Sequence, residues 1–190
     1  MSNYLPLFID MTNRRVTVFG GGAVAARRIG VLLRFGAVVT LVSPEISGET
    51  EQLLKEYEPG QIRYHRRSYR TGELQGEPEF VFACTDDETV NDAIYRECRH
   101  REIPVSVASD QSKCDFYFPA VIEQEDLIIG ISSGGKDHRH VREAAASLRR
   151  QFSEDGHSQP EEERSDKNLQ FKGAESSRKQ QEEAAGKERP

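Results

Sequence analysis

The sequence predicts an α/β fold: a Rossmann-like parallel sheet with helices on both faces, then a β-hairpin plus helix region and a disordered tail. Two observations predict the sheet. A glycine-rich turn joins an apolar run to an amphipathic helix near the N-terminus, and apolar runs then alternate with helical patterns up to residue 107. A third observation, a pair of apolar runs joined by a polar turn, predicts the hairpin.

The glycine turn has the spacing of a dinucleotide-binding fingerprint, G-x-G-x-x-G/A, formed by Gly20, Gly22 and Ala25. A β-branched and aromatic run at 15–19 precedes it, and a helical pattern at 23–35 follows it. Gly20 permits a tight turn, Gly22 leaves room for a pyrophosphate, and Ala25 lets the helix pack close to the strand. The N-terminus of the helix then favours phosphate groups. The motif indicates nucleotide binding; the alternative is a tight turn with no ligand.

The other elements of the predicted sheet follow in order. Strands are expected at 38–42, 62–65, 80–84 and 105–107, and helices at 46–57 and 88–100. The carboxyl ends of parallel strands share one edge, where ligands bind. The cofactor-binding candidates at this edge are Gly20, Gly21, Gly22, Ala23, Val24, Ser43, Pro44, Thr85 and Asp86. Thr85 or Asp86 is also expected to cap the helix that begins at Glu88.

The end of the second strand favours NAD over NADP. An acid is usual there for the adenosine ribose; here the strand ends in neutral Ser43, with Glu45 two residues further on. No arginine immediately follows to hold a 2′-phosphate, although Arg63, Arg66 and Arg67 could approach from elsewhere.

The second half divides into two further parts. Apolar runs at 115–122 and 127–132 flank the polar turn 123–126, and a helix is expected from 137 to 152. Its narrow, alanine-rich apolar side suits packing on another subunit or on the hairpin; an ordinary surface helix is the alternative. We therefore predict a Rossmann domain at 1–112, a dimerisation region at 113–152 and a disordered polar tail at 153–190. A tail that folds on a partner is the alternative to disorder.

Composition excludes several classes of function. The chain has 32 acidic and 26 basic residues, so it lacks the basic excess of a nucleic-acid binder. No secretory or membrane-spanning segment is visible, and Cys84, Cys98 and Cys114 have no metal or redox spacing. His138 and His140 point to different faces of a helix, so no metal site is predicted. A cytoplasmic protein with reduced thiols is expected.

Six sequence blocks, in register, resemble the precorrin-2 dehydrogenase / sirohydrochlorin ferrochelatase family, which also forms the N-terminal region of siroheme synthases. The blocks are Tyr4–Phe8, Val18–Ala25, Val39–Glu45, Ala83–Asn91, Cys114–Ala120 and Ile131–Gly135. The resemblance covers residues 4 to about 150. It implies an NAD-binding domain, a homodimer formed through the hairpin region, and NAD-dependent oxidation of precorrin-2 to sirohydrochlorin. Some members of the family also insert ferrous iron, a lyase activity that this sequence leaves open.

The resemblance also suggests site residues. The position of the family's catalytic aspartate is Ser109 here, with Asp110 beside it, so these two are the catalytic candidates. The tetrapyrrole substrate carries many carboxylates, which suit arginine. The substrate-binding candidates are Ser132, Ser133, Gly134, Arg139 and Arg142.

The chain departs from the family elsewhere too. Asp137 and His138 replace a Ser-Pro pair, and the polar tail stands in place of a helical domain. Two other functions therefore stay open: a protein that holds NAD and tetrapyrrole without turnover, and a redox-sensing Rossmann module.

Overall fold

The structure, a computed structural model, describes residues 4–72, 74 and 78–155 of the 190-residue chain. The chain divides into two units, residues 1–145 and 146–190. The prediction of a disordered tail falls, from residue 156 onward, outside the described residues.

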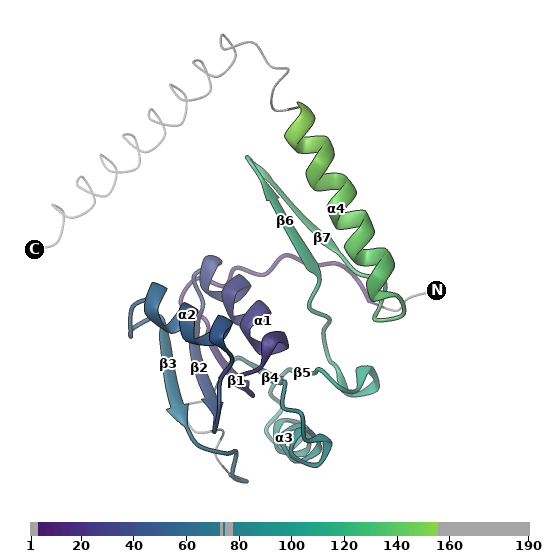
Figure 1. Cartoon of the computed structure of the whole chain (residues 1–190). Helices are drawn as coiled ribbons and strands as arrows, with labels where there is room; N and C mark the ends of the chain where they lie inside the picture. The colour runs from purple at the N-terminus through teal and green to yellow at the C-terminus, as the bar shows by residue number, and fades with distance from the viewer. Residues whose placement is uncertain (1–3, 73, 75–77, 156–190) are drawn as a thin grey trace, which may run out of the picture. The chain divides into compact units, whose positions relative to one another are not determined.

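A five-stranded parallel sheet forms the body of the first unit, in the strand order β3-β2-β1-β4-β5 (Figure 1). The strands are β1 (Arg15–Phe19), β2 (Val38–Ser43), β3 (Ile62–Arg66), β4 (Phe80–Ala83) and β5 (Val105–Val107). Helices α1 (Ala23–Arg34) and α2 (Gly48–Glu56) cover one face, and α3 (Glu88–His100) covers the other. The predicted fold class is confirmed. The strand order reverses between β1 and β4, and such a switch point is where parallel sheets bind ligands.

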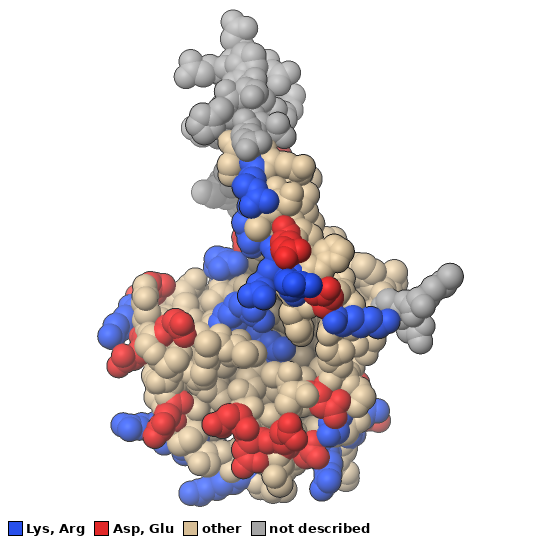
Figure 2. Space-filling view, turned by 45° about the vertical axis from the view of Figure 1, so that its right-hand side comes forward, with Lys and Arg blue, Asp and Glu red and all other residues tan. Residues whose placement is uncertain are grey.

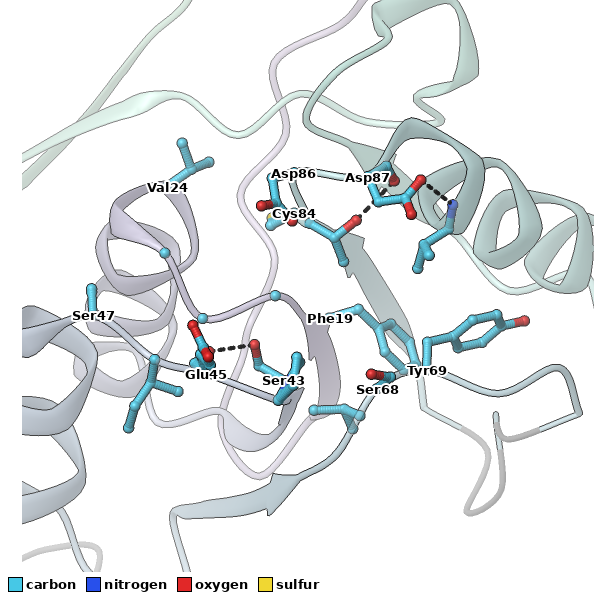
Figure 3. A pocket seen from close by; sticks show the side chains of 18 of the residues that line it. Phe19, Val24, Ser43, Glu45, Ser47, Ser68, Tyr69, Cys84, Asp86 and Asp87 are labelled. Atoms are coloured by element: carbon cyan, nitrogen blue, oxygen red, sulfur yellow. Dashed lines mark hydrogen bonds between the residues drawn. The ribbon is translucent and has the colours of Figure 1, made fainter.

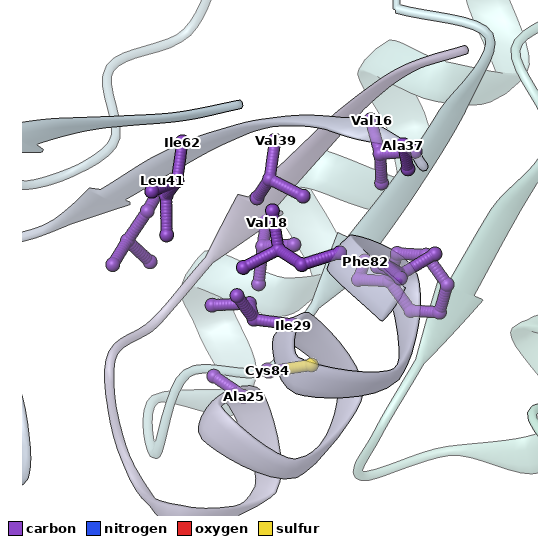
Figure 4. Packing of buried hydrophobic residues seen from close by; sticks show 12 residues of the cluster. Val16, Val18, Ala25, Ile29, Ala37, Val39, Leu41, Ile62, Phe82 and Cys84 are labelled. Carbon is purple, nitrogen blue, oxygen red and sulfur yellow. The ribbon is translucent and has the colours of Figure 1, made fainter. Parts of the chain in front are cut away.

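The core consists of two clusters, one on each face of the sheet. On the α1 side, Val18, Val39 and Leu41 are fully buried beneath Ile29 and Ala25 of the helix (Figure 4). On the other side, Phe19 and Val81 pack with Ile94 and Cys98 of α3. Burial on both faces explains why these strands appear in the sequence as continuous apolar runs.

The hairpin follows the sheet and is shorter than predicted. Strands β6 (Ala120–Gln124) and β7 (Leu127–Ile131) pair antiparallel, with the turn at Glu125 and Asp126. The expected strand from residue 115 is wrong for residues 115–119. Phe116 and Phe118 instead pack edge-on against Phe82 of β4, and Pro119 has no N–H to donate to a ladder.

Helix α4 (His138–Asp155) begins after Asp137, whose Oδ1 accepts from the His140 amide at 2.9 Å. It runs three residues past the predicted end at 152 and crosses the boundary between the two units. In the described part of the chain, no helix is long and apolar enough to cross a membrane.

Candidate cofactor and substrate site

A pocket of about 730 Å³ lies at the carboxyl edge of the sheet (Figure 3). It is lined by the loops that follow β1, β2 and β4, together with Ser68 and Tyr69 after β3. All nine cofactor-binding candidates line it. They are Gly20, Gly21, Gly22, Ala23, Val24, Ser43, Pro44, Thr85 and Asp86. Val24 points outward, 44% exposed, so it belongs to the pocket wall rather than to the core.

The glycine turn forms a cradle in which Gly20 and Gly21 leave no room for a side chain. Gly20 has φ +98°, and a Cβ there would lie 2.4 Å from the Cys84 carbonyl oxygen. A Cβ on Gly21 would lie 2.5 Å from the Glu45 carbonyl oxygen. The backbone of the turn thus lies close against the segments that follow β2 and β4. Gly22, in contrast, faces open space.

The N-terminus of α1 opens toward this space. Gly22 is its N-cap and supplies no side-chain hydrogen bond. The first intrahelical bond is donated by the Ala26 amide to the Gly22 carbonyl, at 2.9 Å. The amides of the first turn therefore remain available to a ligand, and the helix dipole favours an anionic one. These features fit a pyrophosphate.

At the end of β2 the polar groups of Ser43 are already occupied. Its hydroxyl donates to the Glu45 carbonyl (Figure 3). Its carbonyl accepts from the Tyr64 hydroxyl at 3.1 Å. Glu45 is exposed at the pocket, two residues beyond the strand. In this fold the ribose usually binds an acid at the end of β2, and here Glu45 supplies the carboxylate nearest to that position.

At the end of β4 a buried amide joins the pocket wall to the loop after β5. Asn91 of α3 is fully buried. Its Oδ1 accepts from the Thr85 hydroxyl at 2.8 Å, and its Nδ2 donates to the Thr85 carbonyl at 3.0 Å and to Ser109 Oγ at 3.2 Å. Sequence reasoning missed Asn91. The available signal was an amide on the otherwise apolar inward face of α3, three residues before Ile94.

The cap of α3 differs from the prediction. Asp87, rather than Thr85 or Asp86, caps the helix: its Oδ1 accepts from the amides of Thr89 at 2.8 Å and Val90 at 3.3 Å. Asp87 directly precedes the first helical residue, the position from which a side chain reaches those amides. Thr85 is left to bond Asn91, and Asp86 lines the pocket.

Asp110 is engaged in a network of its own. It caps the short 3-10 helix η1 (Gln111–Lys113), and its Oδ1 accepts from the Ser112 hydroxyl at 2.7 Å. Lys113 Nζ lies 3.0 Å from Asp110 Oδ2 and 2.6 Å from Asp92 Oδ1. The hydrogen bonds from Ser112 and Lys113 lower the pKa of Asp110 to about 2. Asp110 is therefore ionised at neutral pH and is a weak base, while neighbouring Ser109 is exposed.

The loop between β7 and α4 approaches η1. Gln111 Nε2 donates to the Gly135 carbonyl at 2.6 Å, which joins the Ser109 loop to the substrate-binding candidates. Ser132 Oγ accepts from the Gly134 amide, and Ser133 Oγ accepts from the Asp137 amide. Both hydroxyl oxygens are thus used to fold the loop itself.

Arg139 and Arg142 are exposed on α4 and do not line the pocket. Figure 2 shows one face on which Lys and Arg side chains gather near the middle, with Asp and Glu concentrated lower down. Among the described residues, no group of three or more His, Cys, Asp or Glu side chains could hold a metal ion.

A parallel sheet of this order, with a glycine cradle and an open helix N-terminus at its switch point, defines a dinucleotide-binding domain. Residues 7–120 match the family described as "Putative NAD(P)-binding". The chain is 40% identical to a siroheme synthase from a Psychrobacter species over 134 residues, which is 70% of this chain and 27% of that protein. It is also 40% identical over 149 residues to siroheme synthase 1 of Pectobacterium atrosepticum, covering 77% of this chain and 30% of the relative.

A comparison with solved structures points to the same family. The chain superposes on SirC, a precorrin-2 dehydrogenase, with a TM-score of 0.64 and 28% sequence identity, over 76% of this chain and 69% of that one. The chain belongs to the NAD(P)-binding family that includes SirC and the N-terminal region of siroheme synthases. The family resemblance predicted from the sequence is confirmed.

Proposed function

We propose that this protein is an NAD-dependent dehydrogenase that oxidises precorrin-2 to sirohydrochlorin. The observation that carries the proposal is the continuity of the site. The glycine cradle connects through Thr85 and Asn91 to Ser109, and Gln111 connects the Ser109 loop to Gly135. A dinucleotide in the pocket and a large substrate against the loop at 132–135 would therefore meet at Ser109. The names of the relatives supply the substrate class.

The cofactor we propose is NAD. Its pyrophosphate would lie over Gly22 and the first-turn amides of α1, and its adenosine ribose would lie at Glu45. A carboxylate at the ribose favours hydroxyl groups over a 2′-phosphate, which supports NAD over NADP. When bound, NAD⁺ accepts the hydride. The protein supplies position and a route for the proton.

Ser109 and Asp110 are the proposed catalytic residues. Because Asn91 donates to Ser109 Oγ, the Ser109 hydroxyl proton remains available to a bound substrate. The ionised carboxylate of Asp110 stabilises positive charge that develops on the tetrapyrrole as hydride leaves. A weak base suffices to remove a proton from such a cationic ring.

A second candidate function is a protein that holds NAD and tetrapyrrole without turnover. The specific observation that favours it is Ser109 itself, a hydroxyl at the position where the family has its catalytic aspartate. Binding would survive this change, because the cradle and the Asn91 network do not depend on a carboxylate there.

One experiment separates the two candidates. Purified protein is mixed with NAD⁺ and precorrin-2 without oxygen, and NADH is followed by its absorbance. Formation of NADH in proportion to enzyme concentration supports the dehydrogenase. Tight tetrapyrrole binding with no NADH supports the binding protein, and the absence of both contradicts each proposal.

A further inference from the structure

Arg28 of α1 carries a charge that the fold does not neutralise. The side chain is half-buried, with its guanidinium carbon 5.4 Å from the ring centre of Phe82 and 6.0 Å from that of Phe118. Its Nη1 donates to Cys84 Sγ at 3.2 Å. Its Nε is buried with no hydrogen-bond partner. Within the described residues, no Asp or Glu forms an ion pair with it.

None of these neighbours is an anion. Burial raises the pKa of the Cys84 thiol, although Arg28 acts in the opposite direction, so the thiol stays neutral at neutral pH. Aromatic rings attract a cation without neutralising it. Other arginines in this unit do have carboxylate partners: Arg34 pairs with Glu123, and Arg99 with Asp115. A half-buried, unpaired guanidinium is costly to keep, and an anionic ligand would offset that cost.

Arg28 does not itself line the pocket, but it contacts both the pocket wall and the segment that leads to the hairpin. Cys84, which it contacts, lines the pocket. Phe118, on its other side, belongs to the segment that leads from η1 to the hairpin. A ligand extending from the pocket toward the loop at 132–135 would therefore pass close to the guanidinium.

We propose that Arg28 binds a carboxylate of the tetrapyrrole substrate. The inference rests on the proposed function for the identity of the ligand, and on the contacts of Arg28 for the site. A guanidinium presents two parallel N–H groups that match the two oxygens of a carboxylate. The guanidinium carbon lies over the rings of Phe82 and Phe118, and both rings attract its charge.

The test is a fluorescence titration of the full chain with sirohydrochlorin. Arg28→Met keeps an apolar stem between the rings and removes the charge. Its neighbour Arg27, exposed on the same helix, gives a control, Arg27→Met, with the same change in net charge. We expect Arg28→Met to weaken sirohydrochlorin binding about 10-fold or more, because a charge-assisted hydrogen-bonded contact is lost. We expect Arg27→Met to leave that affinity roughly unchanged, and both variants to keep their NAD⁺ affinity.

Equal affinities in the two variants overturn the inference and leave the proposed oxidation intact. Binding that depends on Arg28, in a protein that forms no NADH from precorrin-2, supports the inference and contradicts the oxidation. No binding of sirohydrochlorin by the wild-type chain overturns both. Should Arg28→Met also lose NAD⁺ affinity, Arg28→Lys decides, since it keeps the charge and loses the two-pronged geometry. Weaker tetrapyrrole binding with normal NAD⁺ binding then supports the site, and wild-type affinity for both ligands overturns it.

Discussion

At the scale of single residues, Gly22 allows a direct test of the cofactor cradle. Its backbone φ is −79°, a value that every type of residue can adopt. A Cβ at this position would meet no atom within 4 Å. Gly22→Asp should therefore fold normally, since aspartate is also a favourable N-cap. Its carboxylate would occupy the first-turn amides and repel a pyrophosphate, so we expect NAD⁺ affinity to fall about 100-fold or more.

Calorimetry with NAD⁺ measures this loss, and a thermal melt checks the fold. Gly22→Asn is the matched control, with nearly the same size and capping capacity but no charge. A smaller loss in the asparagine variant assigns the effect to electrostatics. Unchanged affinity in Gly22→Asp would remove the glycine turn from the cofactor site.

Ser109 offers a second prediction at this scale. Ser109→Asp would introduce the acid that the family resemblance implies at this position, and Asn91 Nδ2, now 3.2 Å from Ser109 Oγ, would donate to the new carboxylate. We expect turnover with precorrin-2 to rise about 10-fold or more, because a positioned base assists proton removal. Initial rates of NADH formation measure it. Ser109→Asn keeps the size without the charge, and an equal rise in that variant would show that basicity is not the cause.

At the scale of elements, Lys113 links η1 to α3. Lys113 bridges Asp110 and Asp92, and it contributes with Ser112 to the low pKa of Asp110. The ordinary value of this pKa is 3.8. Because the folded value is lower, the contacts of Asp110 stabilise the fold at pH above 3.8, and this contribution disappears as the pH falls toward 2.

Lys113→Met should raise the pKa of Asp110 toward 3.8 and loosen the loop that carries Ser109. NMR titration of the Asp110 carboxyl carbon gives the pKa. Lys136→Met, which removes an exposed lysine from the nearby loop, serves as the control. A pKa that stays near 2 in Lys113→Met would mean that Ser112 alone sets it.

How much of each element could be predicted depends on what its residues face. Strands β1, β2 and β4 are apolar because both faces are buried, so pattern and structure agree within a residue. Phe116 and Phe118 are equally apolar, but they pack side-on against β4, and pattern alone cannot distinguish this from a strand. Pattern does not predict the roles of Asn91, Gln111 and Arg28, because each contacts a residue in another segment of the chain. The order of the strands likewise does not follow from the pattern.

At the scale of the whole molecule, apolar surface on the hairpin suggests a second copy of the chain. Leu127 and Ile128 of β7 are 54% and 47% exposed. A two-stranded hairpin cannot bury such large apolar side chains by itself, so a second surface is expected to cover them. We predict a homodimer formed through the hairpin and the start of α4, as the family resemblance implies.

Light scattering at micromolar concentration tests this prediction. Wild-type protein should have the mass of a dimer, and Ile128→Glu should reduce it to that of a monomer by placing a charge in the interface. Glu51→Gln, on α2, should leave the mass unchanged. A monomeric wild-type chain would contradict the dimer.

The most direct test of the central claim is the stoichiometry of the reaction itself. With NAD⁺ in excess and oxygen excluded, wild-type protein should produce one NADH for each sirohydrochlorin formed from precorrin-2, both measured by absorbance in the same sample. Gly22→Asp, folded but unable to hold the pyrophosphate, should produce neither. Sirohydrochlorin formed without NADH, or at an equal rate in the variant, would show that the glycine cradle does not serve the oxidation.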